Sequence, residues 1–241
     1  MLPADALLSR LRDNVQRIHE RIRAACARAG RDASEVQLVA VTKSAPIELV
    51  ALLPDLGLRV FGENRPQQLL SRAGQLAELC STPVEWHLIG QLQSNKVRSV
   101  LPATCLIHSV DSLGLMQRIS RIAGELDLKP SVLIQVNISG EESKSGFEPE
   151  TLRREWNDLV SLPNVRPIGL MTMAPFTDEE PVIRRTFAGL RQLRQELQQQ
   201  SPEIPFSELS MGMSHDFEIA IEEGATIVRI GSSLFEGCIE T

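Results

Sequence analysis

Lys43 is the first residue in this chain with a recognisable chemical option. It closes a short apolar run, Leu38 to Lys43, whose β-branched and aliphatic side chains predict a buried strand. A lysine in that position can extend its stem along apolar surface and place its ammonium group in water. Alternatively, it can be desolvated, so that its amine pKa falls and the amine attacks a carbonyl to form a Schiff base. The run by itself leaves both interpretations open.

Two glycine- and serine-containing turns could bind a phosphate group. Gly231, Ser232 and Ser233 follow one apolar strand, and Gly212-Met213-Ser214 follows another and precedes a helix. Backbone N–H groups and hydroxyls in such turns can surround a dianion, and a helix N-terminus adds a favourable dipole. The alternative is that these residues only form turns and helix caps.

Three further polar residues stand out, and two of them have both a structural and a functional interpretation. Arg229 lies near the end of an apolar strand, as a structural ion pair or as a cation that faces a ligand. His87, in Trp86-His87-Leu88, is either a hydrogen-bonded core histidine or a catalyst, and Lys144 is most simply a solvated loop residue. A lysine with a phosphate pocket leaves two chemistries: a class I aldolase acting on a sugar phosphate, or pyridoxal phosphate (PLP) held on the lysine.

Eight strand–helix units, preceded by one extra helix over about 6–29, must position these residues. Continuously apolar short strands that alternate with helices indicate a parallel sheet covered on both faces. Eight units in 241 residues predict an α/β protein with a single (β/α)8 barrel, and one domain over residues 1–241. A doubly wound open sheet is disfavoured because the first strand–helix turn has no GxGxxG. The expected strands are 36–43, 58–62, 84–89, 105–110, 131–136, 168–172, 208–211 and 225–230.

A barrel of this kind gathers its functional groups at the carboxyl ends of the strands. Polar or small residues stand at all eight predicted ends, so we expect them to converge on one mouth. They are Lys43, Glu63 with Asn64, His87 with Gly90, His108 with Ser109, Asn137, Met171 with Thr172, Met211 to Ser214, and Arg229 with Gly231 and Ser232.

Composition excludes several classes of partner. The net charge is −6 without a basic run, so nucleic acid is not expected. No apolar run reaches the roughly 18 residues of a membrane span, and the N-terminus lacks a signal-peptide pattern. The four cysteines form no CxxC or Cys/His cluster, which is typical of reduced thiols. We therefore expect a cytoplasmic protein.

Several motifs in order resemble one known family. The chain is similar to the YggS/PROSC family of pyridoxal phosphate homeostasis proteins, and the resemblance covers nearly its whole length. Members are similar to the barrel domain of alanine racemase and bind PLP without a well-established catalytic activity. The segments that carry the resemblance are 40–43 (Ala-Val-Thr-Lys), 61–64 (Phe-Gly-Glu-Asn), 86–90 (Trp-His-Leu-Ile-Gly), 92–96 (Leu-Gln-Ser-Asn-Lys), 136–138, 144–146, 169–173, 209–214 with Asp216, and 228–231 (Val-Arg-Ile-Gly).

The resemblance implies roles for individual residues. Lys43 would hold PLP as a covalent aldimine, and Arg229 would face the pyridine nitrogen. Ser232 stands where many members have threonine, so the hydroxyl is retained. The other implied cofactor contacts are Ser214, Gly231 and Ser232 at the phosphate, and Asn64, His87 and Met211 along the cofactor.

The same resemblance predicts weak catalysis. PLP enzymes that form carbanions usually place a carboxylate at the pyridine nitrogen, whereas an arginine is always cationic and cannot accept a proton there. The chain contains no tyrosine to act as the racemase base, and we expect it to lack a second domain. The expected function is PLP homeostasis, with PLP-dependent apoenzymes as recipients and the protein as a monomer. The alternatives are a PLP-dependent racemase or decarboxylase of low activity, with His87 or a water as second base, and the aldolase.

Overall fold

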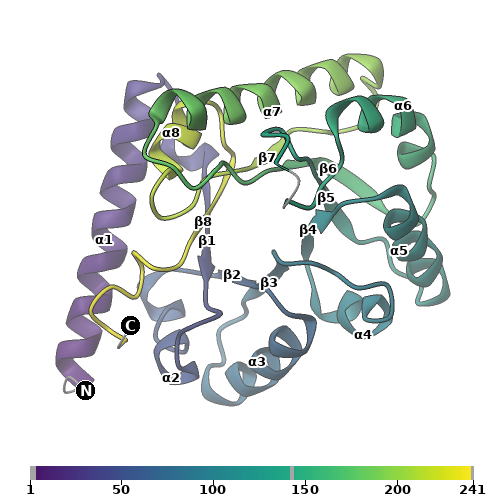
Figure 1. The fold of residues 1–241 in the computed structure, drawn as a ribbon. Helices are drawn as coiled ribbons and strands as arrows, with labels where there is room; N and C mark the ends of the chain where they lie inside the picture. The colour runs from purple at the N-terminus through teal and green to yellow at the C-terminus, as the bar shows by residue number, and fades with distance from the viewer. Residues whose placement is uncertain (1–3, 142–143, 240–241) are drawn as a thin grey trace.

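A closed barrel of eight parallel strands forms the centre of the computed structural model, which describes residues 4–141 and 144–239 (Figure 1). The strands pair in sequence order, and β8 pairs with β1 to close the barrel. The predicted α/β barrel is confirmed. The strands are β1 (Gln37–Val41), β2 (Val60–Glu63), β3 (Glu85–Leu88), β4 (Leu106–Val110), β5 (Ser131–Gln135), β6 (Arg166–Met171), β7 (Glu208–Ser210) and β8 (Ile227–Ile230).

Helices surround the barrel in the order that the alternating pattern predicts. Ser112 caps α5, because its hydroxyl accepts the N–H of Leu115 at 3.3 Å. The helices are α1 (Ala4–Arg28), α2 (Ile47–Val50), α3 (Pro66–Leu79), α4 (Val97–Val100), α5 (Leu113–Glu125), α6 (Pro149–Val160), α7 (Glu180–Gln200) and α8 (Phe217–Glu222), with 3-10 turns η1 (Ala33–Glu35), η2 (Pro54–Leu56) and η3 (Leu101–Ala103). None of the helices in the described ranges is both long and apolar enough to cross a membrane.

The interior of the barrel changes from apolar to polar along the strands. Six buried side chains form a cluster separate from the larger core under the helices: Val39, Val60, Leu106, Leu133, Met171 and Ile227. Because side chains alternate along a strand, the residues two positions further on face the same interior. On three strands these residues are polar, namely His108, Gln135 and Arg229. The barrel therefore has a polar layer toward its carboxyl end.

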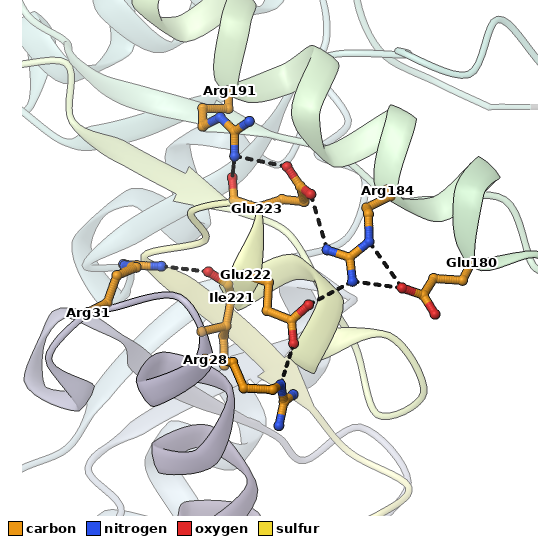
Figure 2. A network of polar contacts seen from close by, with 8 residues as sticks. All are labelled: Arg28, Arg31, Glu180, Arg184, Arg191, Ile221, Glu222 and Glu223. Carbon is orange, nitrogen blue, oxygen red and sulfur yellow. Dashed lines mark hydrogen bonds and ion pairs between the residues drawn. The ribbon is translucent and has the colours of Figure 1, made fainter.

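A polar network on the outside joins α1, α7 and α8, as Figure 2 shows. Arg184 of α7 donates to Glu222 at 2.7 Å and to Glu223 at 3.2 Å, while Arg28 of α1 donates to Glu222 at 2.6 Å. Arg191 donates to Glu223 at 2.8 Å. Partly exposed ion pairs contribute only about 0.2–1 kcal/mol each, so their main effect here is positional. They fix α8, which directly follows the Gly212–Ser214 turn.

The strand boundaries differ from the sequence-based ones at functionally relevant points. The first strand was predicted to run through Lys43, and this was wrong: β1 ends at Val41, and Lys43 lies in the following turn. Likewise β7 ends at Ser210 instead of Met211, and β8 begins at Ile227 instead of Ala225. An apolar run marks buried chain, but strand ends depend on which neighbour supplies hydrogen bonds.

Candidate functional site

Ser214 and the segment after β8 meet at the carboxyl end of the barrel. The hydroxyl oxygen of Ser214 accepts the backbone N–H groups of Gly231 and Ser233, each at 3.4 Å. Both N–H groups therefore point to the same oxygen atom. Because the hydrogen bonds are long, they are weak. A phosphate oxygen is a stronger acceptor for such a pair. Ser233 belongs to the turn that the sequence indicated for a phosphate, but the resemblance implied a contact from Ser232, which is exposed beside it.

The turn that carries Ser214 is held in one shape. Gly212 has a positive φ of 94°, and a Cβ at this position would lie 2.6 Å from the Cβ of Ala220. Only glycine accommodates both the conformation and the close approach of α8. Asp216 is buried and accepts the backbone N–H of Met213 at 2.6 Å. The turn therefore presents the Ser214 hydroxyl in a fixed position.

Arg229 places a buried cation in the same region. Its guanidinium donates to the hydroxyl oxygen of Ser210 at 2.5 Å and to the backbone oxygen of Thr172 at 3.0 Å. Burial lowers its pKa to about 10, and the nearby carboxylate of Asp216 opposes that shift. Arg229 is therefore still cationic at neutral pH. A guanidinium has five N–H donors, so donors remain for a further acceptor.

A chain of buried hydrogen bonds continues from Ser210 through the barrel. Nδ1 of His108 lies 2.9 Å from the Ser210 hydroxyl, and Nε2 of His108 lies 3.1 Å from Nδ1 of His87. Burial lowers the pKa of His87 to about 4 and that of His108 well below its usual value. Both imidazoles are therefore neutral at neutral pH. Sequence reasoning placed His108 at a strand end but missed this chain, although its spacing of two from Leu106 indicated an inward side chain.

Lys43 follows β1, at the same end of the barrel as the segment that follows β8. Because β1 pairs with β8, the residues after these strands are neighbours: the backbone oxygen of Val41 lies 3.3 Å from where a Cβ on Gly231 would be. The Lys43 side chain is exposed. The interpretation of Lys43 as a desolvated lysine therefore does not describe this structure. Its amine is instead accessible at the mouth.

Residues of α3 hold the turn that contains Lys43. Gln68 donates to the backbone oxygen of Lys43 at 2.8 Å, and Arg72 donates to the backbone oxygen of Ala45 at 2.7 Å. Arg72 also pairs with the buried carboxylate of Glu63 at 3.2 Å. Lys43 thus belongs to a turn whose backbone is held by two hydrogen bonds from α3.

Glu63 is the buried acid of this cluster. Burial raises its pKa, and the hydrogen bond from Thr42, at 2.5 Å, and the charge of Arg72 oppose the rise. One carboxylate oxygen of Glu63 and one nitrogen of Arg72 are buried without a hydrogen-bond partner in the described part of the chain. A carboxylate in this position favours a positive charge on the Lys43 side of the mouth.

The remaining predicted residues fall in different places. Asn64 is half-buried, and its backbone oxygen would lie 2.2 Å from a Cβ on Gly90, so this approach requires glycine. Met211 is fully buried next to the Ser214 turn. His87 is a hydrogen-bonded core histidine, and its contact with a cofactor stays a prediction. Lys144 pairs with Glu141 at 3.1 Å.

Comparison with known proteins first defines the class of barrel. The family model described as the N-terminal domain of alanine racemase matches residues 8–237. An alanine racemase of Clostridium difficile superimposes with a TM-score of 0.73 at 18% identity, over 92% of this chain and 56% of that one. At this identity the likeness concerns the fold alone. The chain is thus an alanine racemase-type barrel.

Closer relatives define the family. The pyridoxal phosphate homeostasis protein of Aquifex aeolicus is 44% identical over 223 residues, covering 92% of this chain and 96% of that protein. The protein of that name from Pseudomonas aeruginosa is 44% identical over 230 residues, covering 95% and 96%. PipY of Synechococcus elongatus, solved with PLP bound, is 41% identical with a TM-score of 0.79, over 90% of this chain and 99% of that one. The chain belongs to the pyridoxal phosphate homeostasis protein family.

Proposed function

We propose that this protein binds PLP at the barrel mouth and serves in PLP homeostasis, by buffering the cofactor or delivering it. The observation that carries the proposal is the convergence of the Ser214 hydroxyl with the N–H groups of Gly231 and Ser233, next to the buried cation of Arg229. The names of the relatives and the PLP-bound structure of PipY support it.

The groups at the mouth fit the chemistry of PLP. The N–H groups of Gly231 and Ser233, with the hydroxyls of Ser214 and Ser232, suit the phosphate. Arg229 retains donors for the lone pair of the pyridine nitrogen. The accessible amine of Lys43 suits the aldehyde, to which we propose a covalent Schiff base. Further contacts from Asn64 and Met211 are proposed from the family resemblance. The contact of His87 that the resemblance also implies is not proposed, because His87 lines a cavity at the opposite end of the barrel.

The same residues favour holding the cofactor over rapid turnover. PLP acts as an electron sink in catalysis, and it does so best when its pyridine nitrogen is protonated. Arg229 is a cation with only donors. Its partner Ser210, and the neutral His108 that is hydrogen-bonded to Ser210, are no source of a proton. The nitrogen should therefore remain unprotonated, which weakens the sink. We propose that efficient amino-acid turnover is absent.

The enzyme alternative needs a second base near the substrate. His87 was the candidate, but its Nδ1 is bonded to His108 and its ring lines a cavity at the other end of the barrel. This geometry does not favour a base at the mouth. We propose further that residues 1–241 act as one PLP-binding domain, that the protein is monomeric, and that PLP-dependent apoenzymes receive the cofactor.

The test is the visible absorption spectrum of the purified protein, followed by borohydride reduction and peptide mapping. We expect a yellow protein with pyridoxyl on Lys43. Lys43→Ala should lose the band, whereas Lys129→Ala, at an exposed lysine just before β5, should keep it. A colourless protein that takes up no added PLP would overturn the proposal. Steady racemisation that disappears in Lys43→Ala would overturn the carrier role and leave PLP binding intact.

A further inference from the structure

A cavity opens at the amino end of the barrel, opposite the Ser214 turn. It has a volume of about 350 Å³. Its walls come from the first residues of several strands and from η1, so it is a feature of the closed barrel and not of one loop. The residues that matter for its chemistry are Glu35, Glu85, His87, Glu208 and Thr226.

The cavity has negative electrostatic character. Three glutamates line it, and none of its described lining residues is a lysine or an arginine. Glu208 accepts the hydroxyl of Thr226 at 2.6 Å, and Glu35 pairs with Arg31 at 3.2 Å. Glu85 makes no ion pair or side-chain hydrogen bond within the described ranges. Arg194 lies near Glu208, and Arg166 donates to the lining Ser131 at 2.7 Å, so Glu85 is the carboxylate that favours a cation in the cavity.

His87 forms part of the inner wall. It is only 3% exposed, and its Nδ1 is used by His108. Its Nε2 has no hydrogen-bond partner among the residues that the structure describes. It is also not one of the fully buried polar atoms that lack a partner, so it retains some access to solvent. Since the ring lines this cavity, Nε2 is the free polar atom that the barrel interior presents to it.

The buried hydrogen bonds from Arg229 to His87 favour one tautomer of His87. Arg229 can only donate, so the oxygen of Ser210 accepts from it. The hydroxyl hydrogen of Ser210 then serves Nδ1 of His108, which leaves the proton of His108 on Nε2. That proton is donated to Nδ1 of His87, so the proton of His87 is on Nε2. In this direction the chain ends with an N–H of His87 pointing into the cavity. In the reverse direction the oxygen of Ser210 would accept from both Arg229 and His108, and its hydroxyl hydrogen would have no acceptor among the residues that the structure describes.

We propose that this cavity binds a small protonated amine that also carries an oxygen acceptor, such as an amino alcohol. The carboxylate of Glu85 faces the ammonium group, and Nε2–H of His87 donates to the oxygen. An anion would meet three glutamates, and a neutral alcohol would leave Glu85 without a counter-charge. The site does not depend on the proposed PLP function, because Lys43, Arg229 and the residues of the Ser214 and Gly231–Ser233 turns do not line it.

N,N-dimethylethanolamine is a suitable probe, since a protonated tertiary amine has the required N–H and hydroxyl and cannot form a Schiff base with PLP. Its neutral carbon isostere, 3-methylbutan-1-ol, is the matched control ligand. Long-range ¹H–¹⁵N spectra of the imidazoles, assigned with His87→Asn, report the tautomer and the binding on the purified full chain. We expect His87 to be the Nε2–H tautomer, with a saturable shift on adding the amine and binding at least tenfold weaker for the alcohol.

Glu85→Gln should weaken binding of the amine about fivefold or more, because it removes the counter-charge. Glu148→Gln is the matched control: Glu148 is exposed and immediately precedes α6, at the mouth end of the barrel, and should leave binding unchanged. The proposal is overturned by the Nδ1–H tautomer at His87, by the absence of a saturable shift, by equal binding of the alcohol, or by equal affinities of the two variants. The comparison of the amine with the alcohol uses the wild-type protein, so it tests the proposal even if a variant fails to fold.

Discussion

The guanidinium of Arg229 donates to the hydroxyl oxygen of Ser210 at 2.5 Å, in the buried interior of the barrel. This contact between β8 and β7 joins the cation at the carboxyl end of the barrel to the hydrogen bonds of His108 and His87. It helps to fix the cation that we propose for the pyridine nitrogen, and it sets the direction of the hydrogen-bond chain through His108 to His87.

Ser210→Ala should destabilise the fold. The substitution removes one acceptor of a buried cation and the donor to His108, and a buried unsatisfied group costs about 1–3 kcal/mol. We expect a loss of that size in the free energy of unfolding, measured by urea denaturation. Ser207→Ala is the control, since Ser207 is exposed and lies just before β7. Equal stabilities of the two variants would contradict the structural role of the chain.

Ser214→Ala should weaken PLP binding. Hydrogen bonds to charged groups contribute about 1.5–3 kcal/mol, which corresponds to an affinity loss of roughly tenfold to a hundredfold. The dissociation constant can be measured by titrating the PLP-free protein and following absorption. Ser94→Ala, at an exposed serine in the turn before α4, should bind PLP like the wild type. An unchanged constant in Ser214→Ala would place the phosphate elsewhere.

Gly212→Ala should be destabilising where Gly114→Ala is not. At Gly212 the positive φ and the 2.6 Å approach of Ala220 oppose a Cβ, so we expect a loss of at least about 1 kcal/mol and weaker PLP binding. Gly114, in α5, has no positive φ, and a Cβ added there would meet no atom within 4 Å. Alanine there should stabilise the protein by about 0.4–1 kcal/mol. Thermal or chemical unfolding measures both changes, and the opposite order would refute the argument.

Acid should destabilise the protein through the buried histidines. The pKa of His87 is about 4 in the fold, against 6.5 for an unperturbed histidine, so between these values the unfolded chain binds more protons. The free energy of unfolding should therefore fall as the pH decreases from 7 toward 4, by roughly 3 kcal/mol from His87 alone. His108, next to His87 and Arg229, adds a change of the same sign.

His87→Asn tests this pH dependence, because the asparagine oxygen can still accept from Nε2–H of His108. We expect a shallower dependence of the free energy of unfolding on pH than in the wild type. His215→Asn, at an exposed histidine before α8, should retain the wild-type slope. If His87→Asn retains it as well, the imidazole at position 87 is not responsible.

The sequence by itself determined the barrel and most of its mouth. Eight apolar strands alternating with helices can bury both faces only in a parallel arrangement, and the carboxyl ends of such strands converge. Lys43, Ser214, Arg229 and Gly231 could therefore be selected from their positions at or just after the ends of apolar runs.

The tertiary structure decided which of these groups meet. Ser210 and His108 are 102 residues apart in sequence, and only closure of the barrel brings them within 2.9 Å. Ser233, not Ser232, shares the Ser214 hydroxyl with Gly231, because a backbone N–H is directed by the turn and not by residue type. Lys43 is exposed in the turn after β1, which ends at Val41, and the last hydrogen bond to β2 comes from the N–H of Thr42. These relationships depend on inter-strand geometry, which the order of residues along one strand does not contain.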